Sequence, residues 1–132
     1  MKVLMKFFNK HQGFDTLIGD NIAINGCDEL ILSSNTTTVI AGQLAGGSII
    51  GREDSPSDID LIVSGTVILA ENMLVHSLTI SGTVTVDGLV RCPKMLTIKK
   101  GGKLVAKTIE YTNIVVESGG QVEGQLVPIP LT

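Results

Sequence analysis

The chain has 132 residues, which suits one domain of ordinary size, and 43% of them are hydrophobic, enough to build a sizeable core. Its formal net charge of −3 argues against a nucleic-acid-binding protein, which needs a basic face to contact phosphates. The apolar runs are too short to cross a bilayer and too interrupted for a secretory signal, so we expect a cytoplasmic protein.

The first thirteen residues are basic and aromatic, in contrast to the acidic remainder of the chain. No acidic residue occurs before Asp15. Aromatic and aliphatic side chains beside lysines suit the surface of an anionic membrane, where apolar burial and attraction to headgroups act together. We therefore expect residues 1–13 to be a flexible membrane-binding tail, a disordered tail without a ligand being the alternative. The expected lipid contacts are Lys2, Met5, Lys6, Phe7, Phe8 and Lys10.

From residue 14 onwards, short β-branched runs alternate with glycines, as in a protein made of strands and turns. Runs that end in glycine recur about every 16 to 20 residues, which indicates an internal repeat. One interval is longer and contains residues 52–57, a polar stretch that suggests a loop inserted into one repeat. The composition therefore predicts an all-β fold.

A finer period lies within this repeat, because apolar residues recur at every sixth position from Ile62 to Leu104. Three six-residue faces make a coil of about 18 residues, in which one central side chain per face points into a triangular core. The series fails at Glu110, where we expect the register to slip by one residue because a buried carboxylate is costly. We thus predict a single-domain β-helix of about six coils at residues 14–127, followed by a short tail at 128–132.

The two ends of such a β-helix expose unpaired backbone groups over an apolar cross-section, and they pair with other chains unless a cap covers them. No obvious polar cap precedes the first coil or follows the last one. We therefore expect copies of the chain to associate along the axis, a capped monomer or compact oligomer being the alternative. The expected interface residues are Leu17, Ile18, Ile22 and Ile24 at the N-terminal end and Val122, Leu126, Val127 and Ile129 at the C-terminal end.

Three features of the chain point to a known family: residues 16–19 (Thr-Leu-Ile-Gly), repeated Val/Ile-x-Gly-x-Val units, and residues 117–124 (Glu-Ser-Gly-Gly-Gln-Val-Glu-Gly). In these features the chain resembles the bactofilins, a bacterial cytoskeletal family. The resemblance spans residues 14–127 and implies a right-handed β-helix that polymerises without nucleotide into non-polar filaments. It also implies a scaffold for cell-wall or envelope proteins at the inner face of the cytoplasmic membrane. The handedness depends on this resemblance alone, because a six-residue period fits either hand.

The same six-residue period is found in hexapeptide-repeat acyltransferases, which are left-handed β-helices that form trimers. Such enzymes need a base, usually a histidine, and His76 is the only histidine within the repeats. Their repeats prefer a small residue after the aliphatic one, whereas most positions of this series are followed by larger residues. An acyltransferase is therefore the first alternative to a structural protein.

A second enzymatic alternative is local. Gly46 and Ser48, followed by Asp58 and Asp60, resemble the nucleotidyltransferase signature, in which a Gly-Ser turn holds a triphosphate and paired carboxylates bind magnesium. That fold requires helices around the motif, whereas the flanking sequence is typical of strands. We therefore expect a structural protein without a catalytic, cofactor or metal site. Its expected partners are copies of itself, an anionic membrane and client proteins, but no nucleic acid.

Overall fold

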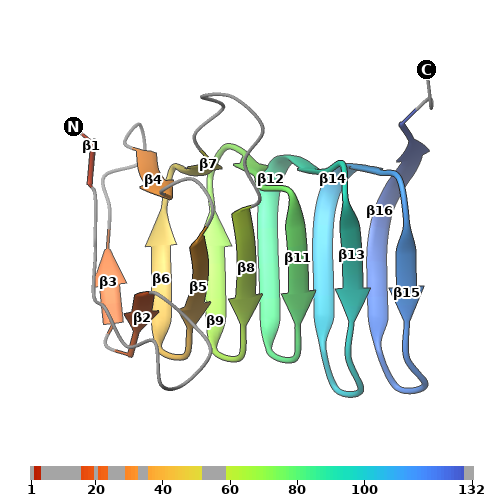
Figure 1. Cartoon of the computed structure of the whole chain (residues 1–132), viewed down its shortest axis with the longest axis horizontal. Coiled ribbons are helices and arrows are strands. Elements are labelled where there is room, and N and C mark those ends of the chain that lie inside the picture. The colour runs from red at the N-terminus through yellow and green to blue at the C-terminus, as the bar shows by residue number, and fades with distance from the viewer. Residues whose placement is uncertain are drawn as a thin grey trace.

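The computed structural model describes residues 2–3, 16–19, 21–23, 29–32, 36–51 and 59–129. Every regular element in these ranges is a β-strand, and the strands wind into a parallel β-solenoid (Figure 1). The predicted all-β fold and its β-helix architecture are confirmed. The handedness stays a prediction from the family resemblance.

The strands are two to five residues long, except for β12, β14 and β16, which have ten, nine and eight residues. The first eight are β1 (Lys2–Val3), β2 (Thr16–Ile18), β3 (Asn21–Ala23), β4 (Glu29–Leu32), β5 (Thr36–Ile40), β6 (Gln43–Gly46), β7 (Ser48–Gly51) and β8 (Ile59–Val63). The others are β9 (Thr66–Leu69), β10 (Met73–Leu74), β11 (Ser77–Ile80), β12 (Thr83–Cys92), β13 (Met95–Ile98), β14 (Lys103–Tyr111), β15 (Ile114–Val116) and β16 (Gln121–Pro128).

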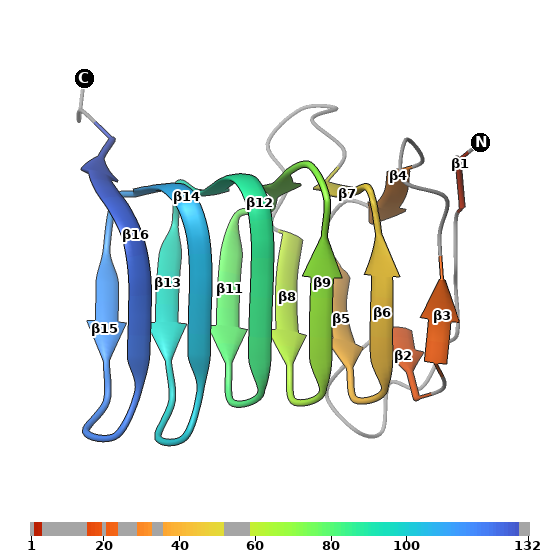
Figure 2. The ribbon, with the colours of Figure 1, turned by 180° about the vertical axis from the view of Figure 1, so that it is seen from behind.

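The solenoid has three faces, and on each face a strand pairs in parallel with its equivalents in the neighbouring coils. The first face is a six-stranded sheet with the order β15-β13-β11-β8-β5-β2. The second face contains β3, β6, β9 and the first halves of β12, β14 and β16, and the third contains β1, β4, β7, β10 and their second halves. Figures 1 and 2 show these strands stacked side by side along the rod, with the N- and C-termini at opposite ends.

Each face buries two side chains per coil rather than the single one that we expected. In the coil formed by β11 and β12, the pair on the first face is Leu78 and Ile80, and each residue is 0% exposed. Side chains of a strand alternate between its two faces, so the residue between such a pair points outwards. A six-residue stretch therefore contributes an i, i+2 pair to the core.

The phase of the predicted six-residue series is wrong in its first half. Ile62, Ile68 and Leu74 lie in outward rows, and Ile68 is 46% exposed, whereas their chain neighbours on either side face the core. The series enters the core only at Ile80, because the corner between Val75 and β11 is one residue shorter than the period requires. The positions from Ile80 to Leu104 are buried as predicted.

The slip that we expected at Glu110 is present. The register between β12 and β14 shifts between Val86 and Leu89, and this shift pairs Ile109 with Val90 in the core. Glu110 consequently faces outwards, where its Oε1 atom lies 2.6 Å from Nη1 of Arg91 in the preceding coil. The carboxylate thus stays at the surface and gains a partner there.

The solenoid makes about four turns, fewer than the six coils that we expected. The buried core runs from Leu30 to Ile109, whereas Ile114 and Val122 of the last coil are only partly buried against it. The first face does contain six strands, so strands continue beyond the enclosed turns. Among the described strands, the last coil has a neighbour on one side only, and for this reason its inward side chains are not enclosed.

Candidate functional site

The C-terminal end of the solenoid presents core-facing side chains that no further coil of the described residues covers. Leu126 on β16 is the register partner of Ile109, and Val116 on β15 is the register partner of Ile98. Ile109 and Ile98 are each 0% exposed, whereas Leu126 and Val116 are 45% and 46% exposed. The end of the rod therefore displays a cross-section of the hydrophobic core.

The backbone at this end is equally open to a partner. In the sheets of the described residues, β15 pairs only with β13, and β16 pairs only with β14. A strand that is paired on one side directs N–H and C=O groups to the other side, where another strand can use them. Gly124, with φ of 136°, lets β16 turn the corner between two faces, because a Cβ there would collide with the carbonyl oxygen of Ala106.

The structure places the four residues expected at this end in different positions. Val122 and Leu126 occupy core rows, as partners of Leu104 and Ile109. Val127 is the partner of Glu110 and thus lies in an outward row. Ile129 follows the end of β16 and donates its backbone N–H to the carbonyl oxygen of Tyr111, with an N···O distance of 2.6 Å.

Sequence reasoning missed the contribution of β15 to this end. Ile114 and Val116 continue the core rows of Leu96 and Ile98 on the first face. The signal was present in the sequence, because residues 114–116 lie 18 residues after 96–98, which is one coil. The open end consists of Ile114, Val116, Val122 and Leu126, which we call the C-terminal end surface.

At the N-terminal end, the predicted residues are placed by their backbone register. Ile18 on β2 pairs with buried Ile40, and Ile22 on β3 pairs with buried Leu44, so both continue core rows. Leu17 pairs with Val39, which is in the outward row of β5. Ile24 lies outside the described residues.

Of the residues expected to bind the membrane, only Lys2 lies in a described range. It forms β1 together with Val3, and β1 pairs with β4 on the third face. The tail was expected to be flexible throughout, yet these two residues extend a sheet of the solenoid. Met5, Lys6, Phe7, Phe8 and Lys10 lie outside the described residues.

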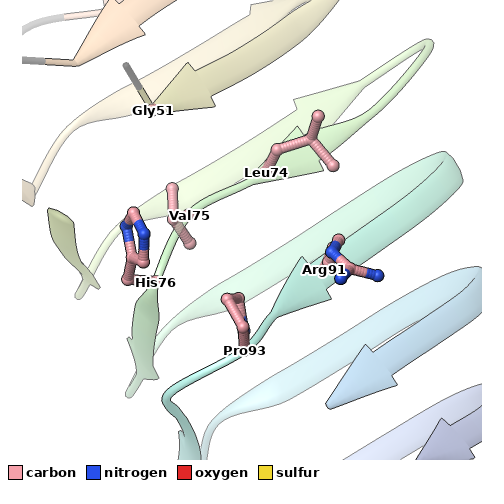
Figure 3. A pocket seen from close by; sticks show the side chains of 6 residues that line it. All are labelled: Gly51, Leu74, Val75, His76, Arg91 and Pro93. Atoms are coloured by element: carbon pink, nitrogen blue, oxygen red, sulfur yellow. The ribbon is translucent and has the colours of Figure 1, made fainter. Parts of the chain in front are cut away.

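A small pocket surrounds His76, the candidate base of the acyltransferase alternative (Figure 3). Its volume is about 50 Å³, far below the roughly 300 Å³ at which small-molecule sites begin. The Nδ1 atom of His76 is buried and has no hydrogen-bond partner among the described residues. A space of this size suits one or two ordered water molecules rather than an acyl donor. The lining residues are Gly51, Leu74, Val75, His76, Arg91 and Pro93.

Three residues of the nucleotidyltransferase pattern, Gly46, Ser48 and Asp60, lie on strands of two neighbouring coils rather than beside helices. The hydroxyl of Ser48, on buried β7, accepts a hydrogen bond from the backbone N–H of Asn72, with an N···O distance of 3.2 Å. This bond ties one coil to the next, so the serine has a structural partner. Asp60 lies on β8 in the row of Thr37 and Ser77, and Asp58 lies outside the described residues.

Neither a metal site nor a membrane-spanning helix is found in the part of the chain that the structure describes. No group of three or more His, Cys, Asp or Glu side chains there has the arrangement of a metal site. None of the described residues forms a helix long and apolar enough to span a membrane. The C-terminal end surface is thus the most distinctive feature of the described structure.

Comparison with models of known protein families matches residues 16–127 to the bactofilins, which are described as polymer-forming cytoskeletal proteins. The chain belongs to the bactofilin family. The predicted resemblance is confirmed over most of the chain, and bactofilin membership supports a structural, cytoskeletal role over the two enzymatic alternatives. No curated protein and no solved structure gives a significant match.

Proposed function

We propose that this bactofilin assembles end to end, without nucleotide, into filaments that form a scaffold on the inner face of the cytoplasmic membrane. The observation that supports this proposal most directly is the C-terminal end surface, where Leu126 and Val116 are nearly half exposed in rows that are buried elsewhere. The scaffold would organise cell-shape or envelope proteins. Its role is structural rather than catalytic.

The physical basis of assembly is completion of the core and of the sheets. When a second copy stacks on the end, the inward side chains of β15 and β16 lose their contact with water. Burying a Leu or Val side chain contributes about 1.5–3 kcal/mol, so the exposed halves of Leu126 and Val116 contribute roughly 1 kcal/mol each. New backbone hydrogen bonds along the edges of β15 and β16 add to this.

We propose non-polar filaments, in which each end of the solenoid contacts the same end of another copy. Such contacts are two-fold symmetric and alternate along the filament. The N-terminal contact would use the rows of Ile18 and Ile22, which continue the buried rows of Ile40 and Leu44. The tail at residues 1–13 would attach the filament to anionic lipid, and many tails on one filament would raise the avidity.

Negative-stain electron microscopy of the full-length protein without nucleotide tests the assembly directly. We expect filaments a few nanometres wide, and discrete particles at all concentrations would refute end-to-end assembly. A variant that lacks residues 1–13 tests the tail separately. It should still form filaments but should no longer sediment with vesicles of anionic lipid, and undiminished sedimentation would refute the membrane contact.

A further inference from the structure

The third face of the solenoid has an extra strand at its N-terminal end. β1 lies parallel to β4, with Lys2 opposite Glu29 and Val3 opposite Leu30. Figures 1 and 2 both show β1 as the outermost element of the rod at this end, beyond β3 and β4. The edge of β4 is therefore already paired with a segment of the same chain.

One core row runs through the whole third face and allows the two ends to be compared. Its members, in register from one coil to the next, are Leu30, Ile49, Met73, Val90, Ile109 and Leu126. At the C-terminal end of this row, Leu126 is 45% exposed, whereas Leu30 at the N-terminal end is 1% exposed. Val3 on β1 stands one step beyond Leu30 in the same row. The row is thus closed at the end where β1 pairs and open at the other end.

We propose that β1 is a displaceable cap on the N-terminal stacking surface, and that a second copy of the chain competes with it for the edge of β4. This inference rests on the proposed function, because the competitor is the next subunit of the filament. An incoming copy that continues the third face needs the same N–H and C=O groups of β4 that β1 uses. The two contacts therefore exclude each other.

The length of β1 makes this cap weak enough to be displaced. It contains two residues, whereas β16 contains eight. A two-residue strand forms very few backbone hydrogen bonds, and each contributes little net stability because water replaces it. The C-terminal ends, which carry no such strand among the described residues, then associate first, and the N-terminal ends associate only after β1 leaves. Covering an edge in this way also limits uncontrolled pairing before assembly.

A reversible disulfide tests the cap without removing any residue. Lys2→Cys and Glu29→Cys are introduced together in a Cys27→Ser background. Register neighbours on adjacent strands lie about 4.8 Å apart, within the range that a disulfide spans. Cys92 is buried in the core and stays in place. We expect the oxidised protein to stop at a dimer, or at a monomer if the contacts are head to tail, and a reductant to restore filaments. The Lys2→Cys single variant, treated identically, is the control.

A second variant pushes the equilibrium in the opposite direction. Lys2→Pro together with Val3→Pro removes both N–H donors of β1, which weakens its pairing with β4. We expect the critical concentration for assembly to fall about tenfold, which corresponds to one or two backbone hydrogen bonds. The conservative Lys2→Arg and Val3→Ile variant should assemble as the wild type does.

The outcomes separate the cap from the function on which it rests. If the reduced protein forms filaments and the oxidised protein forms them equally well, β1 is not a cap. The same conclusion follows if the critical concentration of the proline variant is higher than that of the wild type. If neither the wild type nor the reduced variant forms filaments, both proposals fail.

Discussion

A charge at the C-terminal end surface should abolish filaments without unfolding the protein, and Leu126→Asp is the sharpest such change. Leu126 lies in a core row but has no coil beyond it among the described strands, and it is 45% exposed. Ile68 provides a matched control, because it is an aliphatic residue with 46% exposure on the side of the rod. The two residues are thus alike in exposure and chemistry, but Leu126 lies on the end of the rod and Ile68 on its side.

The magnitude follows from the exposed fraction. Full burial of a leucine contributes about 1.5–3 kcal/mol, so stacking gains roughly 1 kcal/mol from each Leu126 and about 2 kcal/mol from the two copies in a two-fold contact. Losing this term alone weakens the contact about thirtyfold. An aspartate adds the cost of burying two like charges against each other, several kcal/mol more, so the contact should weaken by at least about a thousandfold. Ile68→Asp leaves its charge in water and should change stability by no more than about 0.5 kcal/mol.

Sedimentation across a concentration series, combined with electron microscopy, measures the effect on assembly. Thermal unfolding followed by circular dichroism checks that both variants are folded. We expect Leu126→Asp to remain as small particles with a near-native melting temperature, and Ile68→Asp to form filaments. Filaments of Leu126→Asp at the wild-type critical concentration would refute axial stacking through this end, and an equal loss in Ile68→Asp would point to lateral contacts instead.

Three further predictions concern the fold. Leu96→Ala should lower the free energy of unfolding in urea by about 2–5 kcal/mol, because Leu96 is 0% exposed in the core; a loss well below this range would contradict the packing described. Gly82→Ala should destabilise the solenoid, since a Cβ there would collide with the carbonyl oxygen of Gly65, and an unchanged melting temperature would contradict that contact. Burial raises the pKa of the Cys92 thiol from its ordinary 9.0 to about 12. The protonated thiol therefore stabilises the fold fully below pH 9, and this contribution is lost as the pH rises towards about 12. Denaturation across this window should show a steeper fall for the wild type than for Cys92→Val, and parallel profiles would refute it.

The architecture was predictable from the sequence because the six-residue spacing alone indicates a β-helix. This holds even where the sequence does not show which row of residues faces the core. Apolar residues at every sixth position indicate coils of three short faces whichever row points inwards. The phase was not predictable at residues 61–63, 67–69 and 73–75, because both rows are apolar there. Ile62 and Ile68 point outwards beside Leu61, Val63 and Val67 in the core, and all five are aliphatic. A row becomes identifiable only where its neighbours are polar, as with Thr79 between Leu78 and Ile80.

The site was predictable only in part, for a related reason. Apolar residues in the last coil indicate an exposed end, and the structure places two of the predicted residues, Leu126 and Val122, in core rows. Sequence reasoning could not separate them from Val127, because a bulge between Val105 and Thr108 changes which residues of β16 face inwards. Pairing of β1 with β4 was beyond sequence reasoning, since two residues carry no period.

The two proposals together imply that membrane attachment and filament growth are coupled. Lys2 belongs both to β1 and to the set of residues that we propose bind lipid, so insertion of the tail into lipid would pull β1 away from β4. An anionic membrane that takes up the tail should therefore free the edge of β4 for the next subunit. Anionic vesicles should lower the critical concentration of the wild type, whereas neutral vesicles should leave it unchanged. In the Lys2→Pro and Val3→Pro variant β1 already pairs weakly with β4, so anionic vesicles should have much less effect on its critical concentration. An equal decrease in both proteins would mean that the membrane merely concentrates the subunits and that β1 takes no part in the coupling.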